Sequence, residues 1–470
     1  MSLTLPKRLL YSSGVVNYAL KDAAFGAFVL FYYKQVLGLS GTLTGLAIAI
    51  SVLWDAVSDP MVGAWSDRLR SRWGRRHPFM LAAILPLGLS FAALFSPPDF
   101  ALTSQASLFY WLLASVILLR TALTVFMVPY LALGAEITSD YHERTWLASM
   151  RTNLGWFLGV LAPASAMLLL FNSIDGVDGR FEIDRYRLYG WFNAAAVVVF
   201  SLLCIVGTWH YIPDLLRNAG LHSQNVVRDI LQTFRNRNFR QIVVLETALG
   251  GMGGITSALL MITFTYFWEL EADEISLLMA GPIFMAVLLV SLASPYLNRS
   301  LEKQQLLRLS CILGMLNLLW LTPLKLFDLL PGAQQLVFAL IFVNYGIYVA
   351  STILRTVSSH ALLADIADEH DLASGQRQEG IMFAAAFFAA KFISGFGYLV
   401  AGPLLDLIGL EAGAQPGQTP ASVDWGLGLI MGPGLALLML IPVWMAYRLD
   451  LSHAGQQRVQ AALRARAAAD

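Results

Sequence analysis

Charged residues are scarce in this chain. They make up 13% of its 470 residues, whereas hydrophobic residues make up 57%. Soluble globular domains carry about a quarter of charged residues. The composition therefore excludes an ordinary soluble protein and predicts a membrane protein.

Cysteine and recognisable ligand motifs are also scarce. The two cysteines, Cys204 and Cys311, lie in apolar runs, which excludes a disulfide framework and a CxxC metal or redox site. The seven histidines include no HExxH or other ligand pair. The glycine-rich run 250–254 does not follow a strand, so we expect close helix packing or a broken helix there and not a nucleotide site. We expect no cofactor and no nucleic-acid partner.

Long apolar runs are what the chain has in abundance. A run of about 20 residues can cross a bilayer as a helix. Twelve such runs are present, at residues 10–36, 42–66, 79–96, 108–136, 146–171, 189–210, 241–267, 276–297, 304–324, 335–362, 380–408 and 426–447. The predicted class is an all-α membrane protein with 12 transmembrane helices.

Lys and Arg concentrate in alternate loops between these runs. The loop 67–76 is strongly basic, whereas the loops 96–107, 269–274 and 411–424 have almost no basic residues. The loop that contains Arg180 is an exception, and nearby acids balance its charge. The positive-inside rule then predicts cytoplasmic termini in an inner (plasma) membrane. Lys21 and Asp22 interrupt the first run, which predicts a retained helix and not a signal peptide.

A long basic segment divides the twelve runs into two sets of six. We therefore predict an N-terminal six-helix bundle (1–211), a cytoplasmic basic linker (212–240), a C-terminal six-helix bundle (241–448) and a cytoplasmic tail (449–470). Paired halves with a solute site near the midplane are a recurring transporter architecture. We expect a monomer in the lipid bilayer.

Two acids lie inside the second apolar run. Asp55 and Asp59 are four residues apart, so on a helix both carboxylates project from one face, one turn apart. A charge at membrane depth is costly, by about 2.5–3.5 kcal/mol even on insertion scales, and it usually marks an ion or substrate pathway. The alternative is a purely structural role for the two acids, in a hinge at Pro60. The pair predicts that the chain moves a solute across the membrane.

Several motifs resemble those of one transporter family, the glycoside–pentoside–hexuronide:cation symporters of the major facilitator superfamily, to which the melibiose permease belongs. They are Trp54-Asp55-Ala56-x-x-Asp59-Pro60, Gly63-Ala64-Trp65-Ser66-Asp67-Arg68 with Arg75-Arg76, Val128-Pro129-Tyr130-x-Ala132-Leu133, Glu143-Arg144-Thr145, and Ala364-Asp365-Ile366-x-Asp368 with Arg377-x-Glu379-Gly380. The matches cover both halves in the right order. The resemblance implies the major facilitator fold, with two six-helix bundles.

The resemblance also implies roles for individual residues. It implies coupling-cation ligands at Asp55, Ser58, Asp59 and Thr124, a lysine near the cation and substrate sites at Lys391, and sugar contacts at Arg151 and Asp22. The coupling ion that it implies is Na⁺ or H⁺. No further metal site is expected.

The chain departs from the family pattern on its fourth span. The positions of a sugar-contacting acid and of an aromatic platform fall on Met127 and Leu131, which bind hydroxyl groups poorly. Arg120 replaces a small residue. At 100° per residue it lies within about 40° of Thr124 and Met127, on the face that should look toward the two acids. We hold open whether Arg120 reaches them or pairs elsewhere.

Further charged residues lie in the loops. We assign Asp67 and Arg68 to a topology and gating loop. The acids Asp365, Asp368, Glu369 and Asp371, with Arg377 and Glu379, are interpreted either as a solvated cytoplasmic loop or as a gate that pairs with the basic loops.

These observations predict a secondary active transporter and not an enzyme. The expected activity is cation-coupled symport of a sugar, glycoside or related small organic solute by alternating access. A lysophospholipid or other amphiphile is an alternative cargo, because Met127 and Leu131 suit a less polar molecule. The alternative from another class is a membrane prenyltransferase-type enzyme, in which two aspartate-rich motifs would hold magnesium.

Overall fold

The computed structural model describes residues 4–138, 140–174, 176–212, 233–375 and 378–469. Over these residues the chain is helical and contains no β-strand, apart from an isolated bridge between Ile174 and Val177. The predicted all-α class is confirmed.

The described residues contain twelve helical segments that are long and apolar enough to cross a membrane. They are Leu5–Val36, Gly41–Arg68, His77–Thr103, Gln105–Gly134, Glu143–Leu169, Ile183–Tyr211, Arg237–Phe267, Ala272–Leu297, Lys303–Leu326, Gln334–Ser374, Glu379–Leu407 and Ala421–Arg448. Each of them overlaps one of the twelve predicted runs. The tenth differs most, since it continues to Ser374 and not to about residue 362.

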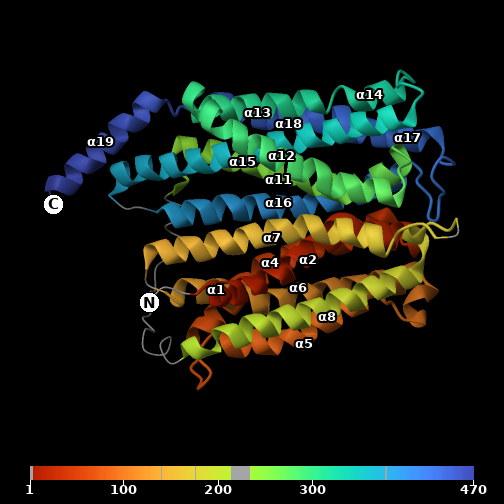
Figure 1. Ribbon diagram of the computed structural model, residues 1–470, viewed down its shortest axis with the longest axis horizontal. Helices are drawn as coiled ribbons and strands as arrows, with labels where there is room; N and C mark the ends of the chain where they lie inside the picture. Colours follow the sequence, from red (N-terminus) through yellow and green to blue (C-terminus); the bar gives the residue numbers. More distant parts are fainter. Residues whose placement is uncertain (1–3, 139, 175, 213–232, 376–377, 470) are drawn as a thin grey trace. The chain divides into compact units, whose positions relative to one another are not determined.

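The first six spans consist of α1 to α8 (Figure 1). The first span is a series of short elements, α1 (Leu5–Ser12), α2 (Val16–Ala23) and α3 (Val29–Phe31), joined by a 3-10 turn (Ser13–Val15) and extended by π-helical turns at Ala24–Phe28 and Tyr32–Val36. The others are α4 (Gly41–Arg68), α5 (His77–Phe95), α6 (Gln105–Glu136), α7 (Tyr141–Leu169) and α8 (Ile183–Thr208).

The last six spans consist of α11 to α18, and one more helix follows them. Their bounds are α11 (Arg237–Ile262) with a π-helical end (Thr263–Phe267), α12 (Ala272–Ser300), α13 (Lys303–Asn317), α14 (Leu321–Leu326), α15 (Gln334–Ser374), α16 (Glu379–Leu407), α17 (Ala421–Leu429) and α18 (Leu435–Arg448). The predicted tail forms α19 (His453–Ala469). Most of the predicted linker, residues 213–232, lies outside the described residues.

Polar side chains fix where the long helices begin. The Ser40 hydroxyl accepts a hydrogen bond from the Leu43 amide at 3.1 Å, immediately before α4. The Asp140 carboxylate accepts one from the Glu143 amide at 2.8 Å before α7. Such N-caps satisfy amide groups that have no partner within the helix. The helix that carries the paired acids therefore has a defined start, and Pro60 lies inside it without ending it.

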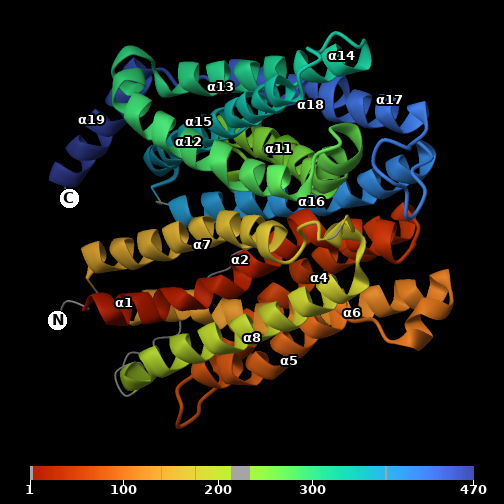
Figure 2. The same ribbon diagram turned by 45° about the vertical axis from the view of Figure 1, so that its right-hand side comes forward.

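The chain forms two compact units that cut across its sequence halves. The first unit contains Met1–His222, Leu260–Met279 and Tyr398–Thr419, and the second contains Ser223–Leu259, Ala280–Gly397 and Pro420–Asp470. In the first unit, α5 packs against α6 and α8, and α4 packs against α6 (Figures 1 and 2). In the second unit, α13 packs against α15 and α18.

Glycines allow the end of α16 to approach α4 closely within the first unit. A Cβ atom added at Gly41 would lie 2.5 Å from the Gly402 carbonyl oxygen. Beside this crossing, the Lys34 ammonium lies 2.8 Å from the Asp406 carboxylate, which also accepts a hydrogen bond from the Gly41 amide. Small residues that let backbones touch are common at helix contacts in membranes.

In the second unit, the glycine run 250–254 on α11 likewise allows the backbones of two helices to approach closely. Cβ atoms added at Gly250 and Gly254 would lie 2.3 Å and 2.1 Å from backbone carbonyl oxygens of α16. The helix α11 continues through the run. Of the two readings of this segment, close packing is confirmed and a broken helix is wrong.

Candidate functional site

The first acid of the α4 pair forms an ion pair with an arginine of α6. A terminal nitrogen of Arg120 (Nη1) lies 2.5 Å from a carboxylate oxygen of Asp55 (Oδ2), and both residues are 6% exposed. The guanidinium carbon also lies 5.0 Å from the centre of the Phe25 ring. The structure thus places Arg120 against Asp55, and its guanidinium is a fixed positive charge beside that acid.

The second acid contacts the threonine that the family resemblance indicated. The Thr124 hydroxyl donates a hydrogen bond to Asp59 at 2.7 Å. Thr124 lies one helical turn beyond Arg120 on α6, and Asp59 lies one turn beyond Asp55 on α4. Two adjacent polar contacts therefore join the two helices in register.

Ser58 lies on the same side of α4 as the two acids. It is buried, and its hydroxyl oxygen has no hydrogen-bond partner within the part of the chain that the structure describes. A buried polar atom without a partner costs about 1–3 kcal/mol. An oxygen of this kind, on the helix that carries the two carboxylates, has the chemistry of a ligand for a small cation.

A hydrogen bond between side chains holds α4 and α6 together beside this cluster. The Trp54 indole donates to the Thr121 hydroxyl at 2.8 Å. Trp54 precedes Asp55 directly, and Thr121 follows Arg120 directly. This neighbouring bond fixes the rotation of both helices at the level of the ion pair.

Asp22, the expected sugar-contacting acid, lies on α2 in the first unit. Its carboxylate contacts the ammonium group of the adjacent Lys21, and its side chain is 51% exposed. The Lys21 ammonium also lies 4.2 Å from the centre of the Tyr18 ring. Asp22 is therefore accessible, and the positive charge of Lys21 neutralises its carboxylate.

The other expected substrate residues of the first unit differ in their exposure. Met127 is buried, whereas Leu131, one turn further along α6, is 44% exposed. Arg151 on α7 is half-buried, and its guanidinium donates to the Tyr11 hydroxyl at 3.4 Å. Tyr11 in turn stacks on Tyr130 of α6.

Lys391 lies on α16, in the part of that helix that belongs to the second unit. Its carbonyl oxygen accepts a hydrogen bond from the Ser394 hydroxyl at 2.6 Å. Its role remains a prediction from the family resemblance.

The loop between α4 and α5 is tied to α6 by charge. The Arg76 guanidinium lies 2.6 Å from Asp67 and 2.8 Å from Glu136, and Arg75 also lies 2.8 Å from Glu136. Contrary to the expectation from the sequence, Asp67 and Arg68 do not lie in this loop but form the last two residues of α4, where Arg68 is exposed. The sequence did not indicate Glu136 as the partner of this loop, although an acid next to the end of an apolar run is a usable signal.

The acids of residues 365–371 are not in a loop, and that interpretation is wrong. They lie on α15, because the apolar residues among them follow a helical spacing and enter the core of the second unit, namely Leu362, Leu363, Ile366 and Ala367. Asp365 contacts Lys303 at 2.8 Å, and Asp368 accepts from Gln456 of α19 at 3.0 Å. Glu379 begins α16, and Arg377 lies outside the described residues.

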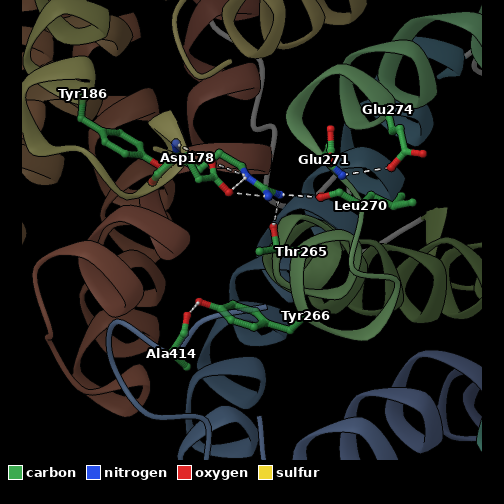
Figure 3. Close-up of polar contacts among 9 residues, drawn as sticks. Asp178, Tyr186, Thr265, Tyr266, Leu270, Glu271, Glu274 and Ala414 are labelled. Carbon is green, nitrogen blue, oxygen red and sulfur yellow. Dashed lines mark hydrogen bonds and ion pairs between the residues drawn. The ribbon is translucent and has the colours of Figure 1, made fainter. Parts of the chain in front are cut away.

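Sequence reasoning missed the buried role of Arg180. Its guanidinium contacts Asp178 at 2.6 Å and donates to the Thr265 hydroxyl and the Leu270 carbonyl, each at 3.0 Å (Figure 3). Tyr186 donates to the Arg180 carbonyl at 2.9 Å. Within the first unit, this cluster fastens the segment after α7 to the segment that follows α11.

Replacing Arg180 by alanine should destabilise the protein measurably. Its removal takes the cation away from Asp178 and the side-chain donor away from the Leu270 carbonyl. Breaking one side of a fully buried ion pair costs about 3–5 kcal/mol, and the cost is smaller here because the Asp178 side chain is 25% exposed. We expect a clear fall in the thermal unfolding temperature of the purified protein. Arg187→Ala is the matched control, since Arg187 pairs with Asp184 at an exposed surface, where such pairs contribute about 0–1 kcal/mol. Equal effects of the two substitutions would contradict the assigned role.

Comparisons with known proteins agree with this architecture. The sequence profile described as "MFS/sugar transport protein" matches residues 10–453. The putative glycoside/cation symporter YagG of Escherichia coli (strain K12) is 25% identical over 412 residues, which cover 85% of this chain and 84% of that protein. The sodium-dependent lysophosphatidylcholine symporter 1-A of Danio rerio is 21% identical over 478 residues, which cover 96% and 86%.

A solved structure shows the same fold. The crystal structure of the nucleoside transporter NupG superposes with a TM-score of 0.66 at 12% sequence identity, over 94% of this chain and 99% of that one. The predicted fold is confirmed, and the chain is a multi-pass protein of the inner membrane. A prenyltransferase-type enzyme is excluded by the family. With nearly its whole length matched, the chain belongs to the MFS/sugar transport protein family of membrane transporters.

Proposed function

We propose that the protein is a symporter that couples the movement of a glycoside or a related small organic solute to a Na⁺ or H⁺ gradient. The observation that carries the proposal is the cluster of Asp55, Asp59, Arg120 and Thr124 inside two apolar helices. Ionisable groups at membrane depth, facing each other between helices, are typical of ion pathways in transporters. Two of the relatives are themselves named symporters, which supports symport as the mode of transport.

The mechanism follows from the charges in the cluster. Arg120 is permanently charged and pairs with Asp55, so it acts as a tethered cation at one of the two carboxylates. We assign the transported cation to the part of the site formed by Ser58, Asp59 and Thr124. Binding there favours the conformations that enclose the site, and a solute that prefers the same conformations is then linked to the cation through that difference in affinity.

The test is uptake by the purified protein in lipid vesicles. A screen of sugars, sugar acids and lysolipids for thermal stabilisation, with and without Na⁺, identifies the solute. Imposed Na⁺ and pH gradients then identify the coupling ion. Solute flux that ignores both gradients would contradict symport.

Simple galactosides should bind weakly. The family resemblance implies a sugar-contacting carboxylate and an aromatic ring at the positions of Met127 and Leu131, and a thioether is a poor acceptor for hydroxyl groups. We expect melibiose and lactose to show no binding tighter than about 1 mM, equivalent to about −4 kcal/mol. Isothermal titration calorimetry checks this. Millimolar or tighter galactoside binding would restore the ordinary sugar assignment.

A lysophospholipid is the second candidate solute. The exposed side chain of Leu131 and the sodium-dependent lysophosphatidylcholine symporter among the relatives favour it. Competition between a sugar and a lysolipid in one binding assay separates the two solutes.

We also propose that both termini are cytoplasmic, on the basis of the alternating Lys and Arg content of the loops. Reporter fusions at the C-terminus and in the loop 96–104 should report opposite sides of the membrane.

A further inference from the structure

A cavity of about 660 Å³ lies between three helices of the second unit. Its walls come from the end of α12, the start of α13 and about one turn of α15. The loop that joins α12 to α13 lies at the same end of this unit as α19 (Figures 1 and 2). Pockets for drug-sized molecules measure roughly 300–1,000 Å³, so this cavity is large enough for a small molecule or a lipid headgroup.

Arg299, in the last turn of α12, brings an available positive charge to the wall of this cavity. The residue is exposed, and among the described residues its side chain has no ion pair and no hydrogen bond. The neighbouring charges are engaged, because Lys303 lies 2.8 Å from Asp365 and the Glu302 side chain caps the start of α13. One uncompensated guanidinium favours a ligand with a single negative charge.

Ser358 indicates a ligand independently of the charge. It is 5% exposed and lines the cavity from α15. Within the described part of the chain its hydroxyl group has no hydrogen-bond partner. Buried hydroxyl groups are normally paired with protein, water or a bound molecule, because an unpaired one is costly. The cavity is where a partner for this hydroxyl group can sit.

The donors at the wall match an oxyanion. Arg299 offers a planar fork of N–H groups, and Ser358 offers a hydroxyl group. The side-chain oxygen of Gln305 accepts a hydrogen bond from the Glu302 amide at 3.0 Å, which leaves its NH₂ group as a third donor. A guanidinium pairs bidentately with phosphate oxygens. A singly charged phosphodiester therefore fits both the charge and the donors.

The level of the cavity is that of a membrane surface. Its α15 wall lies at residues 357–361, the end of the predicted apolar run 335–362. Arg308 of α13 lies over the Tyr447 ring of α18, which packs against α13, and Arg448 lies over the Trp444 ring. Aromatic and basic residues are enriched where a span meets the lipid headgroups.

An exposed apolar stripe on α12 leads to the cavity. Leu288, Leu292 and Tyr296 are 59%, 61% and 73% exposed. They follow one another at intervals of four residues, so they lie on one face of the helix. Ser300 is the next residue of this series, and it lines the cavity. A ligand with a phosphodiester in the cavity and an acyl chain along the stripe would cover both features.

We propose that this cavity binds the headgroup of an anionic phospholipid of the surrounding bilayer, with Arg299 and Ser358 on the phosphodiester and an acyl chain along the stripe of α12. Basic pockets between transmembrane helices hold anionic headgroups in other membrane proteins. The lipid is a ligand from the bilayer and not the transported solute, so this inference does not depend on the proposed function.

The test is a fluorescence titration of the purified full-length protein in a neutral detergent. The probe is phosphatidylglycerol with a fluorophore on one acyl chain, and the competitors are unlabelled phosphatidylglycerol, phosphatidylcholine and glycerol 3-phosphate. We expect only unlabelled phosphatidylglycerol to displace the probe. Arg299→Gln should weaken probe binding by about 10- to 100-fold, the effect of losing hydrogen bonds to a charged group. Ser358→Ala should weaken it by about 2- to 10-fold.

Controls separate specific binding from folding and from general attraction. Thermal unfolding without lipid reports whether each variant is folded. Arg448→Gln is the matched control, because Arg448 is an exposed cation near the end of α18 that does not line the cavity. At about 1 M salt, where the Debye length is about 3 Å, Arg448→Gln should bind the probe like the parent protein, whereas Arg299→Gln should remain defective.

Several results would overturn the assignment. Equal displacement by phosphatidylcholine would show that the headgroup charge is not read, and equal displacement by glycerol 3-phosphate would indicate a site for a free phosphate compound. Undiminished probe binding by folded Arg299→Gln, or an equal loss in Arg448→Gln at high salt, would exclude a site at this cavity. Loss of solute uptake in Arg299→Gln with full lipid binding would assign the residue to transport and would likewise overturn the proposal.

Discussion

Asp59→Asn is expected to abolish gradient-driven accumulation of the solute while leaving part of its binding intact. The amide keeps the volume of the side chain and can still accept a hydrogen bond from Thr124, but it carries no charge to attract Na⁺ and cannot take up a proton. Without a coupled cation the solute can only equilibrate, so the ratio of inside to outside concentration in vesicles should fall to about 1.

The measurement is solute uptake into vesicles under an imposed gradient, with equilibrium binding measured on the same preparation. Asp184→Asn is the matched control, because the Asp184 side chain is 88% exposed and pairs with Arg187. It should accumulate solute like the parent protein. Accumulation by Asp59→Asn with an unaltered cation dependence would remove Asp59 from the coupling site.

The sequence predicted the membrane architecture well because the underlying signal is local. Each span is a run of apolar residues whose length is set by the thickness of the bilayer, and all twelve predicted runs overlap a helix. The face of α6 on which Arg120 lies could also be predicted, because helical periodicity alone puts Arg120 on the same face as Thr124. The structure supplied the partner, Asp55.

What the sequence did not predict depends on contacts between distant segments. Nothing local indicates that Arg180 reaches Thr265, or that Lys34 reaches Asp406. The extension of α15 past residue 362 was missed because its acids resemble a solvated loop. Their spacing nevertheless leaves a buried apolar stripe, which is the pattern of a helix.

Glu246 of α11 and Arg355 of α15, which line one cavity of the second unit, show a different kind of omission. Both lie within apolar runs, so the rule that identified Asp55 and Asp59 applied to them equally. They were overlooked because each stands alone in its span and matches no family motif. The cavity connects them, and a cavity cannot be predicted from either span alone.

Arg120 should determine which cation the transporter uses, and its replacement should change the cation dependence of uptake strongly. In the parent protein the Arg120 guanidinium neutralises the Asp55 carboxylate. We therefore expect that solute uptake is either driven by a pH gradient or only weakly coupled to a cation, and that Na⁺ stimulates it little. Arg120→Gly frees the carboxylate beside Ser58 and Asp59. The variant should then acquire sodium-stimulated uptake.

The thermal stability of the variant gives an independent measure of whether Na⁺ takes the place of the Arg120 charge. Breaking a buried ion pair from one side costs about 3–5 kcal/mol, so the variant should unfold at a lower temperature in the absence of Na⁺. A cation that binds only the folded state restores stability by about 2.7 kcal/mol at 100 times its dissociation constant. We therefore expect Na⁺, but not the larger organic cation N-methyl-D-glucamine, to raise the unfolding temperature of Arg120→Gly more than that of the parent protein.

The control substitutions separate the effect of losing the positive charge from the effect of placing glycine inside a helix. Glycine inside a helix costs about 1 kcal/mol relative to alanine, so Arg120→Ala should show the same sodium effects with a smaller loss of stability. Arg120→Lys keeps a positive charge and should remain insensitive to Na⁺. Strong sodium stimulation of the parent protein, combined with indifference to a pH gradient, would show that Arg120 does not act as a tethered cation. In that case the ion pair with Asp55 would serve to join α4 and α6, and the coupling site would have to accommodate Na⁺ with the guanidinium in place.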